Sequence, residues 1–330
     1  MKRWLGNLAA LLGSAAVMAL LFEGACRTVL NSGTQYHIEM WKYAVQLKRI
    51  SANPEIGHEH VPGGVARLMD AEVRINKDGL RDREHPPAKA PGEVRILMLG
   101  DSTMFGWGVK QDETIAKHVE QALNKDAPDP FVEVINSGVG NYNTAMEVAY
   151  FLERGVATKP DVVVLNYFIN DAEPTPIYRD VPWWARHFYA YAVLGGAWDG
   201  FKRRMSGAEQ DYKAYYAGLY SAPGWERAQA AIAKLAEVCR AQGIRLIISN
   251  IPEMHELKPY AFPDVQKKIE DVAKAVGAEY VDLLPAVENE DPASMWVTVP
   301  DPHPNAKATK LLGDYLAAYL AAHPTAAAKD

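Results

Sequence analysis

The sequence predicts an α/β fold in which a doubly wound parallel sheet is flanked by helices. Short apolar runs at 96–99, 131–135 and 161–167 each end in glycine or small polar residues. Runs of this length and composition are typical of strands buried on both faces. Helix-like stretches alternate with these runs, as a sheet of strand–helix–strand units requires. We therefore expect parallel strands whose carboxyl ends share one edge.

The rest of the chain continues this alternation. Further strands are predicted at 244–250 and 279–283, and helices at 145–157, 225–242, 264–276 and 306–320. A helix is also expected to start near Ser102, directly after the first apolar run. The C-terminal helix follows a proline-rich loop, 301–305.

The N-terminus carries an apolar segment that suits a membrane span. Lys2 and Arg3 precede residues 4–22, in which Gly, Asn and Ser are the only non-apolar members. At about 1.5 Å per residue this length crosses a bilayer as a helix. A secretory signal peptide has a similar pattern, but residues 23–26 lack a clear small-x-small cleavage site. We expect an uncleaved single-pass transmembrane anchor at 1–30, with its basic end in the cytoplasm.

Ser102 stands where a nucleophile would lie in such a sheet. Gly100-Asp101-Ser102 stops the first apolar run, and helix-start amides there can face a developing negative charge. A plain turn with capping residues gives the same local pattern. Asp301 and His303 offer the partners that a serine needs, because an imidazole takes its proton and a carboxylate holds the imidazole.

Two further loops supply hydrogen-bond donors near the same edge. Residues 136–144 form a polar, glycine-bearing loop after the second run, and Asn170 follows the third. In a parallel sheet these loops and Ser102 share one crevice at the carboxyl edge. The order of the blocks along the chain fits a single site.

These blocks resemble those of the SGNH hydrolases, the GDSL lipase and esterase superfamily, from about residue 94 to the C-terminus. The resemblance implies a flavodoxin-like three-layer fold, with Ser102 as nucleophile, His303 as base and Asp301 as its orienter. It also implies an oxyanion hole made by the amide of Ser102 and the side chain of Asn170.

One feature departs from the family's pattern, and another adds to the match. The family's oxyanion glycine falls on Asn141, whose backbone amide can still donate, since Asn tolerates left-handed conformations; Gly140 is the fallback donor. Residues 75–82 resemble a segment that often precedes the first block in membrane-anchored bacterial members. We accordingly divide the chain into an anchor (1–30), a lead-in segment (31–91) and a hydrolase-like domain (92–330).

An insertion at about 172–223 is dense in aromatic residues. Such side chains suit a glycan lid, a helix resting on a membrane, or the small core of a helical subdomain. Among them we predict that Trp183 and Trp184 bind substrate.

Composition limits the other classes of function. A net charge of −6 gives no electrostatic footprint for nucleic acid. Cys26 and Cys239 are the only cysteines, which implies neither a disulfide framework nor a metal site. No cofactor is expected.

The sequence therefore predicts a serine esterase, or an O-acyltransferase, held in the inner membrane with its domain on the periplasmic side. The family resemblance and the envelope placement imply an O-acyl group of a cell-envelope or exported polysaccharide as substrate, with a lipid or a small ester as the alternative. The envelope polysaccharide machinery is a candidate partner. The altered glycine positions leave one alternative: a catalytically silent glycan-binding scaffold in an export or modification complex.

Overall fold

A five-stranded parallel sheet forms the centre of the molecule. The structure is a computed structural model that describes residues 2–29, 33, 35–125, 131–178, 180–205, 212–299 and 301–325. The sheet has the order β6-β5-β7-β8-β9, and every neighbouring pair is parallel. Its strands are β5 (Val94–Leu99), β6 (Val132–Asn136), β7 (Val162–Tyr167), β8 (Arg245–Asn250) and β9 (Glu279–Asp282). This order confirms the doubly wound fold, whose crevice lies at the carboxyl ends of β5 and β7.

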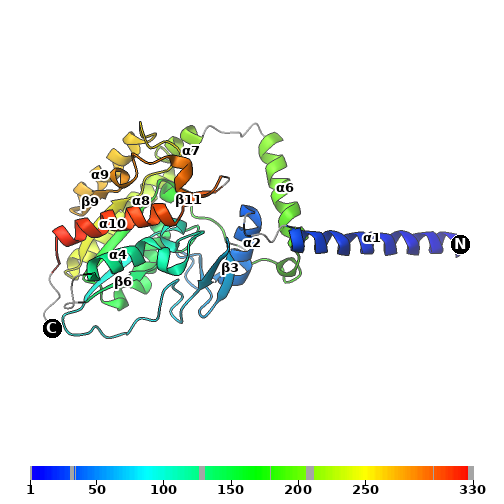
Figure 1. The fold of residues 1–330 in the computed structure, drawn as a ribbon, viewed down its shortest axis with the longest axis horizontal. Helices are drawn as coiled ribbons and strands as arrows, with labels where there is room; N and C mark the ends of the chain where they lie inside the picture. The colour runs from blue at the N-terminus through cyan, green and yellow to red at the C-terminus, as the bar shows by residue number, and fades with distance from the viewer. Residues whose placement is uncertain are drawn as a thin grey trace.

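Helices cover both faces of the sheet (Figure 1). One face carries α5 (Thr144–Glu153), α8 (Pro223–Ala241) and α9 (Pro263–Val276), and the other carries α4 (Ile115–Asn124) and α10 (Ala306–Ala322). Because side chains alternate along a strand, Val163 and Leu165 of β7 enter the first core, whereas Val162 and Val164 enter the second. The three layers predicted from the sequence are therefore present.

The start of α10 fixes the segment that carries His303. The Asn305 side chain accepts hydrogen bonds from the backbone N–H groups of Lys307 and Ala308, which caps the helix. The preceding residues Asp301–Pro304 form β11, which pairs antiparallel with β10 (Trp296–Thr298). The sequence predicted a loop here. A two-stranded ribbon has open edges and therefore tolerates its two prolines.

The helix predicted at Ser102 is shorter than expected. Only α3 (Ser102–Phe105) forms, because Gly106 ends it in the left-handed conformation at φ 82°. A loop and the 3₁₀ turn η1 (Gln111–Glu113) then lead to α4. Ser102 thus lies on a tight single turn at the end of β5.

The lead-in segment is folded and lies against that turn. It contains α2 (Tyr36–Leu47) and two hairpins, β1 (Lys48–Ile50) with β2 (His58–His60) and β3 (Val65–Leu68) with β4 (Ala71–Arg74). Its apolar side chains form a third core together with Phe105 and Trp107. The division at residues 31 and 91 stays a prediction, and Asn31 itself lies outside the described residues.

Residues 75–82 hold the back of the Ser102 turn. The buried Arg81 guanidinium donates to the carbonyl oxygens of Phe105 (2.9 Å), Gly106 and Val109 (2.6 Å). Asp82 accepts the backbone N–H of Asn136 at 2.9 Å, after which the second loop begins. This segment therefore ties the first and second motif blocks together.

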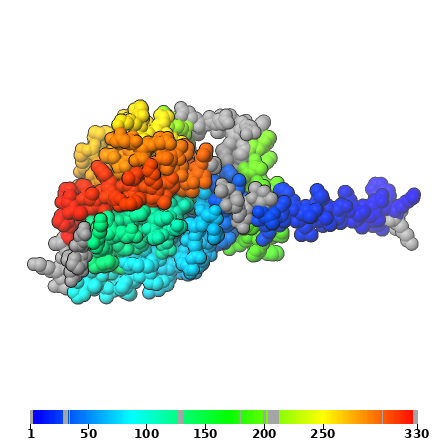
Figure 2. Space-filling model, viewed as in Figure 1, coloured from blue at the N-terminus to red at the C-terminus, as the bar shows by residue number. Residues whose placement is uncertain are grey.

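The N-terminal helix α1 (Lys2–Val29) projects away from the rest of the molecule (Figures 1 and 2). Its stretch Arg3–Thr28 has a mean hydropathy of 2.0, and within the described part of the chain it is the one helix that suits a membrane span. An anchor and a signal sequence share these properties. The insertion contributes η4 (Ala185–His187), α6 (Tyr189–Met205) and α7 (Tyr212–Leu219).

Replacing Arg81 should destabilise the fold strongly. Arg81→Met leaves three buried carbonyl oxygens without their donor, which we expect to cost about 3 kcal/mol or more of unfolding free energy. The exposed Arg74, paired with Glu72, is the control, and Arg74→Met should change stability by less than about 0.5 kcal/mol. Denaturant unfolding of the detergent-solubilised full chain measures both, and equal stabilities would contradict this role of Arg81.

Candidate active site

Ser102, His303 and Asp301 form a continuous hydrogen-bonded chain. Ser102 Oγ lies 2.9 Å from His303 Nε2, although the two residues are 201 positions apart. His303 Nδ1 lies 2.5 Å from Asp301 Oδ1. The imidazole is thus placed to accept the serine proton while the carboxylate holds its other nitrogen.

Asp301 is fully buried and keeps two strong donors. Its second oxygen, Oδ2, accepts the indole N–H of Trp107 at 2.7 Å. Burial alone would raise the pKa of Asp301, but the hydrogen bonds from His303 and Trp107 outweigh it and lower the pKa. Asp301 therefore remains a carboxylate that orients His303.

The turn at Ser102 requires its neighbours. A Cβ on Gly100 would lie 2.3 Å from Met104 Cγ, so only glycine fits beneath the turn. Asp101 accepts the N–H of Thr103 at 2.8 Å, and its burial raises its pKa. The Thr103 N–H is therefore engaged. The N–H of Ser102 is the other backbone donor next to the reacting hydroxyl.

Asn141 adopts a left-handed backbone conformation. Its φ is 68°, in the left-handed region that asparagine enters more readily than other side chains. Gly140 has its own amide engaged, since this N–H donates to Tyr43 Oη at 2.9 Å. Of the two candidate donors in this loop, Asn141 is thus the one that lines the cavity beside Ser102.

Lys48 holds this loop from the lead-in segment. Its Nζ donates to Gly140 O at 2.5 Å and to Asn141 Oδ1 at 2.8 Å, and it lies 4.3 Å from the centre of the Tyr43 ring. The residue is buried, which lowers the pKa of its amine well below the ordinary value. A side chain of β1 therefore braces the residue that replaces the glycine.

Asn170 is presented by a short 3₁₀ turn, η3 (Ile169–Ala172). Asp171 closes this turn by accepting the N–H of Phe168 at 3.0 Å. Behind it lies Glu147 of α5, and burial raises the pKa of both carboxyl groups well above the ordinary range. Two buried carboxyl groups with raised pKa values thus lie next to the turn that carries Asn170.

These groups open into one cavity of about 300 Å³. Ser102, His303, Asn141 and Asn170 line it, as do Pro302 and Pro304. Three aromatic rings and a carboxylate complete the wall: Tyr36, Phe168, Tyr216 and Glu253. The structure therefore brings together the predicted serine, histidine and oxyanion residues, with Asp301 directly behind them.

Trp183 and Trp184 are not part of this cavity. Their side chains are 75% and 48% exposed, on the segment before α6 and next to the end of α1. His187, three residues further on, accepts a hydrogen bond from Arg27 of α1. The two tryptophans were predicted to bind substrate. The structure places them on a different surface from the Ser102 cavity.

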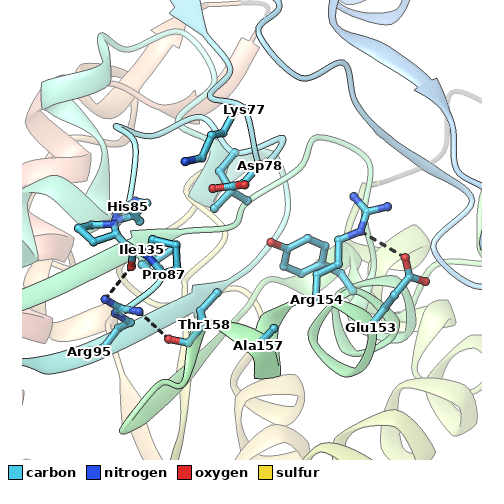
Figure 3. A pocket seen from close by; sticks show the side chains of 13 residues that line it. Lys77, Asp78, His85, Pro87, Arg95, Ile135, Glu153, Arg154, Ala157 and Thr158 are labelled. Atoms are coloured by element: carbon cyan, nitrogen blue, oxygen red, sulfur yellow. Dashed lines mark hydrogen bonds and ion pairs between the residues drawn. The ribbon is translucent and has the colours of Figure 1, made fainter. Parts of the chain in front are cut away.

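A second cavity, of about 380 Å³, lies between the lead-in segment and α5 (Figure 3). Its two arginines are already paired: Arg95 contacts the carbonyls of Pro86 and Thr158, and Arg154 contacts Glu153. Its lining holds no serine or cysteine beside a histidine. It offers no nucleophile–base pair, so we assign the chemistry to the smaller cavity.

No metal cluster accompanies either cavity. Among the residues that the structure describes, no group of three or more His, Cys, Asp or Glu side chains is arranged to hold an ion.

The sequence that forms this site matches a known protein family. Residues 98–311, more than half of the chain, match the GDSL-like lipase/acylhydrolase family. The chain belongs to this family. The matched region begins within β5 and extends into α10, so it contains every residue of the hydrogen-bonded chain.

Solved structures of GDSL-type hydrolases are similar to this family member. A lipase/acylhydrolase from Enterococcus faecalis is 15% identical, with 71% of this chain and 100% of that chain covered and a TM-score of 0.44. A GDSL-like lipase from Bacteroides thetaiotaomicron is 14% identical (72% and 92% covered, TM-score 0.42). A variant of an acetyl-xylooligosaccharide esterase from Geobacillus stearmophilus is 16% identical (69% and 93% covered, TM-score 0.44). Comparison with curated proteins found no match.

Sequence reasoning missed three residues around the site. Trp107, Tyr36 and Lys48 each contact a member of it, through Asp301, His303 and Asn141 respectively. Tyr36 and Lys48 belong to a segment for which no secondary structure was predicted. Of the three, only Trp107 could have been found from the sequence, because it lies close to Ser102 along the chain.

The buried Glu147 makes stability depend on pH. In the unfolded chain it ionises near the ordinary pKa of 4.5, whereas burial in the folded protein raises this pKa well above that value. The unfolding free energy should therefore fall as pH rises above that value. Glu147→Gln removes this contribution, so the variant should gain melting temperature over wild type at about pH 8 and lose that advantage near pH 4.5.

Thermal unfolding across this pH range measures the effect. The control is Glu237→Gln on the exposed surface of α8, where the carboxylate pairs with Lys234. A Glu147→Gln difference that stays constant with pH, like the control's, would show that this carboxyl is ionised in the folded protein.

Proposed function

We propose that this protein is a serine ester hydrolase in which Ser102 is the nucleophile, His303 the general base and Asp301 the residue that orients it. The observation that carries this proposal is the hydrogen-bonded chain from Asp301 through His303 to Ser102, which opens into a cavity. Membership of the GDSL-like lipase/acylhydrolase family supports the same class of reaction.

Acylation follows from this arrangement. Ser102 Oγ attacks the ester carbonyl carbon while His303 Nε2 takes the hydroxyl proton. When the tetrahedral intermediate collapses, the bond to the leaving oxygen breaks, and His303 returns the proton to that oxygen. The products of this step are a free alcohol and an acyl group on Ser102.

The negative charge on the carbonyl oxygen needs donors at the cavity wall. The backbone amides of Ser102 and Asn141 and the side-chain amide of Asn170 are the proposed oxyanion hole. Loss of one such donor typically costs about 3 kcal/mol of transition-state stabilisation.

Release of the acyl group needs an acceptor hydroxyl. Water, deprotonated by His303, attacks the acyl carbon and gives hydrolysis with recovery of Ser102. A sugar hydroxyl in the same position would give O-acyl transfer instead. Both outcomes use the same residues, and we propose hydrolysis as the basic activity.

The cavity favours a short acyl group on a polar acceptor. A volume of about 300 Å³ lies at the small end of ligand pockets. The rings of Tyr36 and Tyr216 offer flat, partly polar surfaces. We therefore propose an O-acyl group of a cell-envelope or exported polysaccharide as substrate, with the polysaccharide machinery as partner.

The end of α1 supports retention of this helix as an anchor. Glu23 and Arg27 make hydrogen bonds to the insertion, and Cys26 between them is buried. Cleavage near Cys26 would remove contacts that belong to the folded protein. We propose a single-pass inner-membrane protein with its catalytic domain on the periplasmic side.

The alternative of a silent scaffold rested on the altered second and third blocks and on the position of Asp301, two residues before His303. Asn141 has a left-handed φ of 68°, and Asp301 Oδ1 lies 2.5 Å from His303 Nδ1. Both observations support the enzyme, which we retain as our proposal.

The proposal predicts which residues are needed for turnover. Ser102→Ala and His303→Ala should each lower hydrolysis of p-nitrophenyl acetate by the full chain at least about a thousandfold, because each removes a member of one catalytic unit. Ser221→Ala and His323→Ala change the same residue types at exposed positions and should keep full activity. Equal turnover in all four variants and the wild type would contradict the proposed roles.

Lys48 should act as a positioning residue for the oxyanion amide. Lys48→Met should lower kcat on the order of tenfold to a hundredfold with little change in KM, because the Asn141 amide loses its brace. Asn141→Gly keeps the amide and adopts the same φ without help. The loss caused by Lys48→Met should therefore be much smaller in the Asn141→Gly background.

This double-mutant cycle separates positioning from general stability. Melting temperatures of the single and double variants show whether the fold is retained. An equal loss of kcat in both backgrounds would mean that Lys48 does not act through Asn141.

A further inference from the structure

The helix α6 carries an apolar stripe that the described part of the chain leaves exposed. Tyr191, Leu194, Trp198 and Phe201 recur at helical spacing, so they lie along one side of the helix. Their exposed fractions are 42%, 59%, 60% and 53%. Four large exposed side chains in a row form a patch of the kind that marks a binding surface.

The opposite side of α6 faces the protein. Ala192 is buried, and a Cβ on Gly196 would lie 3.4 Å from the His37 ring of α2. The Tyr189 ring contacts Trp41 of α2, with centroids 5.1 Å apart. The stripe therefore faces away from α2, whose Tyr36 lines the Ser102 cavity.

The start of α6 is joined to α1. The Glu23 carboxylate accepts the backbone N–H groups of Tyr189 (3.1 Å) and Ala190 (2.9 Å), which caps α6 from a residue of the apolar helix. The guanidinium of Arg27 lies 5.2 Å from the Tyr189 ring centre. These contacts set the direction of α6 relative to α1.

That direction is across α1 (Figure 1). Figure 2 shows α6 at the base of α1, where this helix leaves the rest of the molecule. If α1 spans a membrane, a helix that crosses its outer end runs along the membrane surface. The stripe, turned away from α2, then faces the bilayer.

We propose that α6 is an interfacial helix whose stripe lies in the outer surface of the same bilayer that α1 spans. Aromatic side chains with polar atoms are enriched at this depth, because one part of the ring is apolar and the other hydrated. The exposed Trp183 and Trp184 extend the patch, and the Trp184 ring contacts Tyr191 at 5.6 Å. This inference rests on the anchor proposed above.

The two helices of the insertion then have different roles. Tyr216 of α7 lines the Ser102 cavity, whereas none of the α6 side chains that the structure describes does. The insertion thus supplies one wall of the cavity through α7 and a membrane contact through α6. The catalytic opening is held in a fixed orientation above the bilayer.

Fluorescence quenching in vesicles tests this placement. The full chain is reconstituted in phosphatidylcholine vesicles that contain lipid with a shallow or a deep doxyl quencher. An environment-sensitive thiol probe is attached at Tyr191→Cys in the stripe or at Tyr315→Cys, a tyrosine of similar exposure (38%) on α10. Both native cysteines are buried, and the unsubstituted chain measures their background.

The probe at Tyr191→Cys should lose fluorescence mainly to the shallow quencher, and the probe at Tyr315→Cys should lose none. A Leu12→Cys probe within α1 reports the anchor and should respond mainly to the deep quencher. Adding Leu194→Glu and Trp198→Glu should abolish quenching at Tyr191→Cys without changing p-nitrophenyl acetate hydrolysis.

Three results would overturn the inference. Quenching at Leu12→Cys but not at Tyr191→Cys means that α6 does not touch the bilayer, although the anchor stands. No quenching at either position removes the anchor and the interfacial helix together. A Tyr191→Cys probe that is shielded from water, shows energy transfer between labelled copies and is not quenched by lipid means that a second copy covers the stripe.

Discussion

The burial of Asp301 is the constraint on which the rest of the site depends. A carboxylate without solvent must be hydrogen-bonded, and the two donors that satisfy it come from His303 and Trp107. Trp107 is itself held in a core that the lead-in segment builds with Phe105. The geometry at Ser102 therefore depends on the lead-in segment as well, which precedes the region 98–311 that matches the family.

The sequence was sufficient for the sheet and for the residues at its carboxyl edge. Runs such as 161–167 were apolar enough to show a strand, and the residues after them were polar enough to show where it ended. Parallel strands then place Ser102 and Asn170 in one crevice, and Asp301 and His303, before the C-terminal helix, offered the residues that a serine nucleophile needs. Asparagine tolerates left-handed conformations, and the φ of 68° at Asn141 agrees with that argument.

The lead-in segment could not be predicted in the same way. Its strands have three or four residues each, which is too few to reveal a hydrophobic period. The residues that the segment contacts at the site lie far away in the sequence. From the sequence alone Lys48 would be assigned to the surface, but in the fold its Nζ donates to Gly140 O. Likewise, aromatic content alone did not show that α6 and α7 of the insertion face different surroundings.

The central claim is that Ser102 is an activated nucleophile. A fluorophosphonate probe that reacts with such serines, followed by mass spectrometry of the labelled peptide, tests it most directly. The account predicts one adduct on Ser102, absent in Ser102→Ala and formed more slowly in Asp301→Asn, in which the orienting charge is lost. A well-folded protein that stays unlabelled, or that carries the adduct on another residue, would contradict the account.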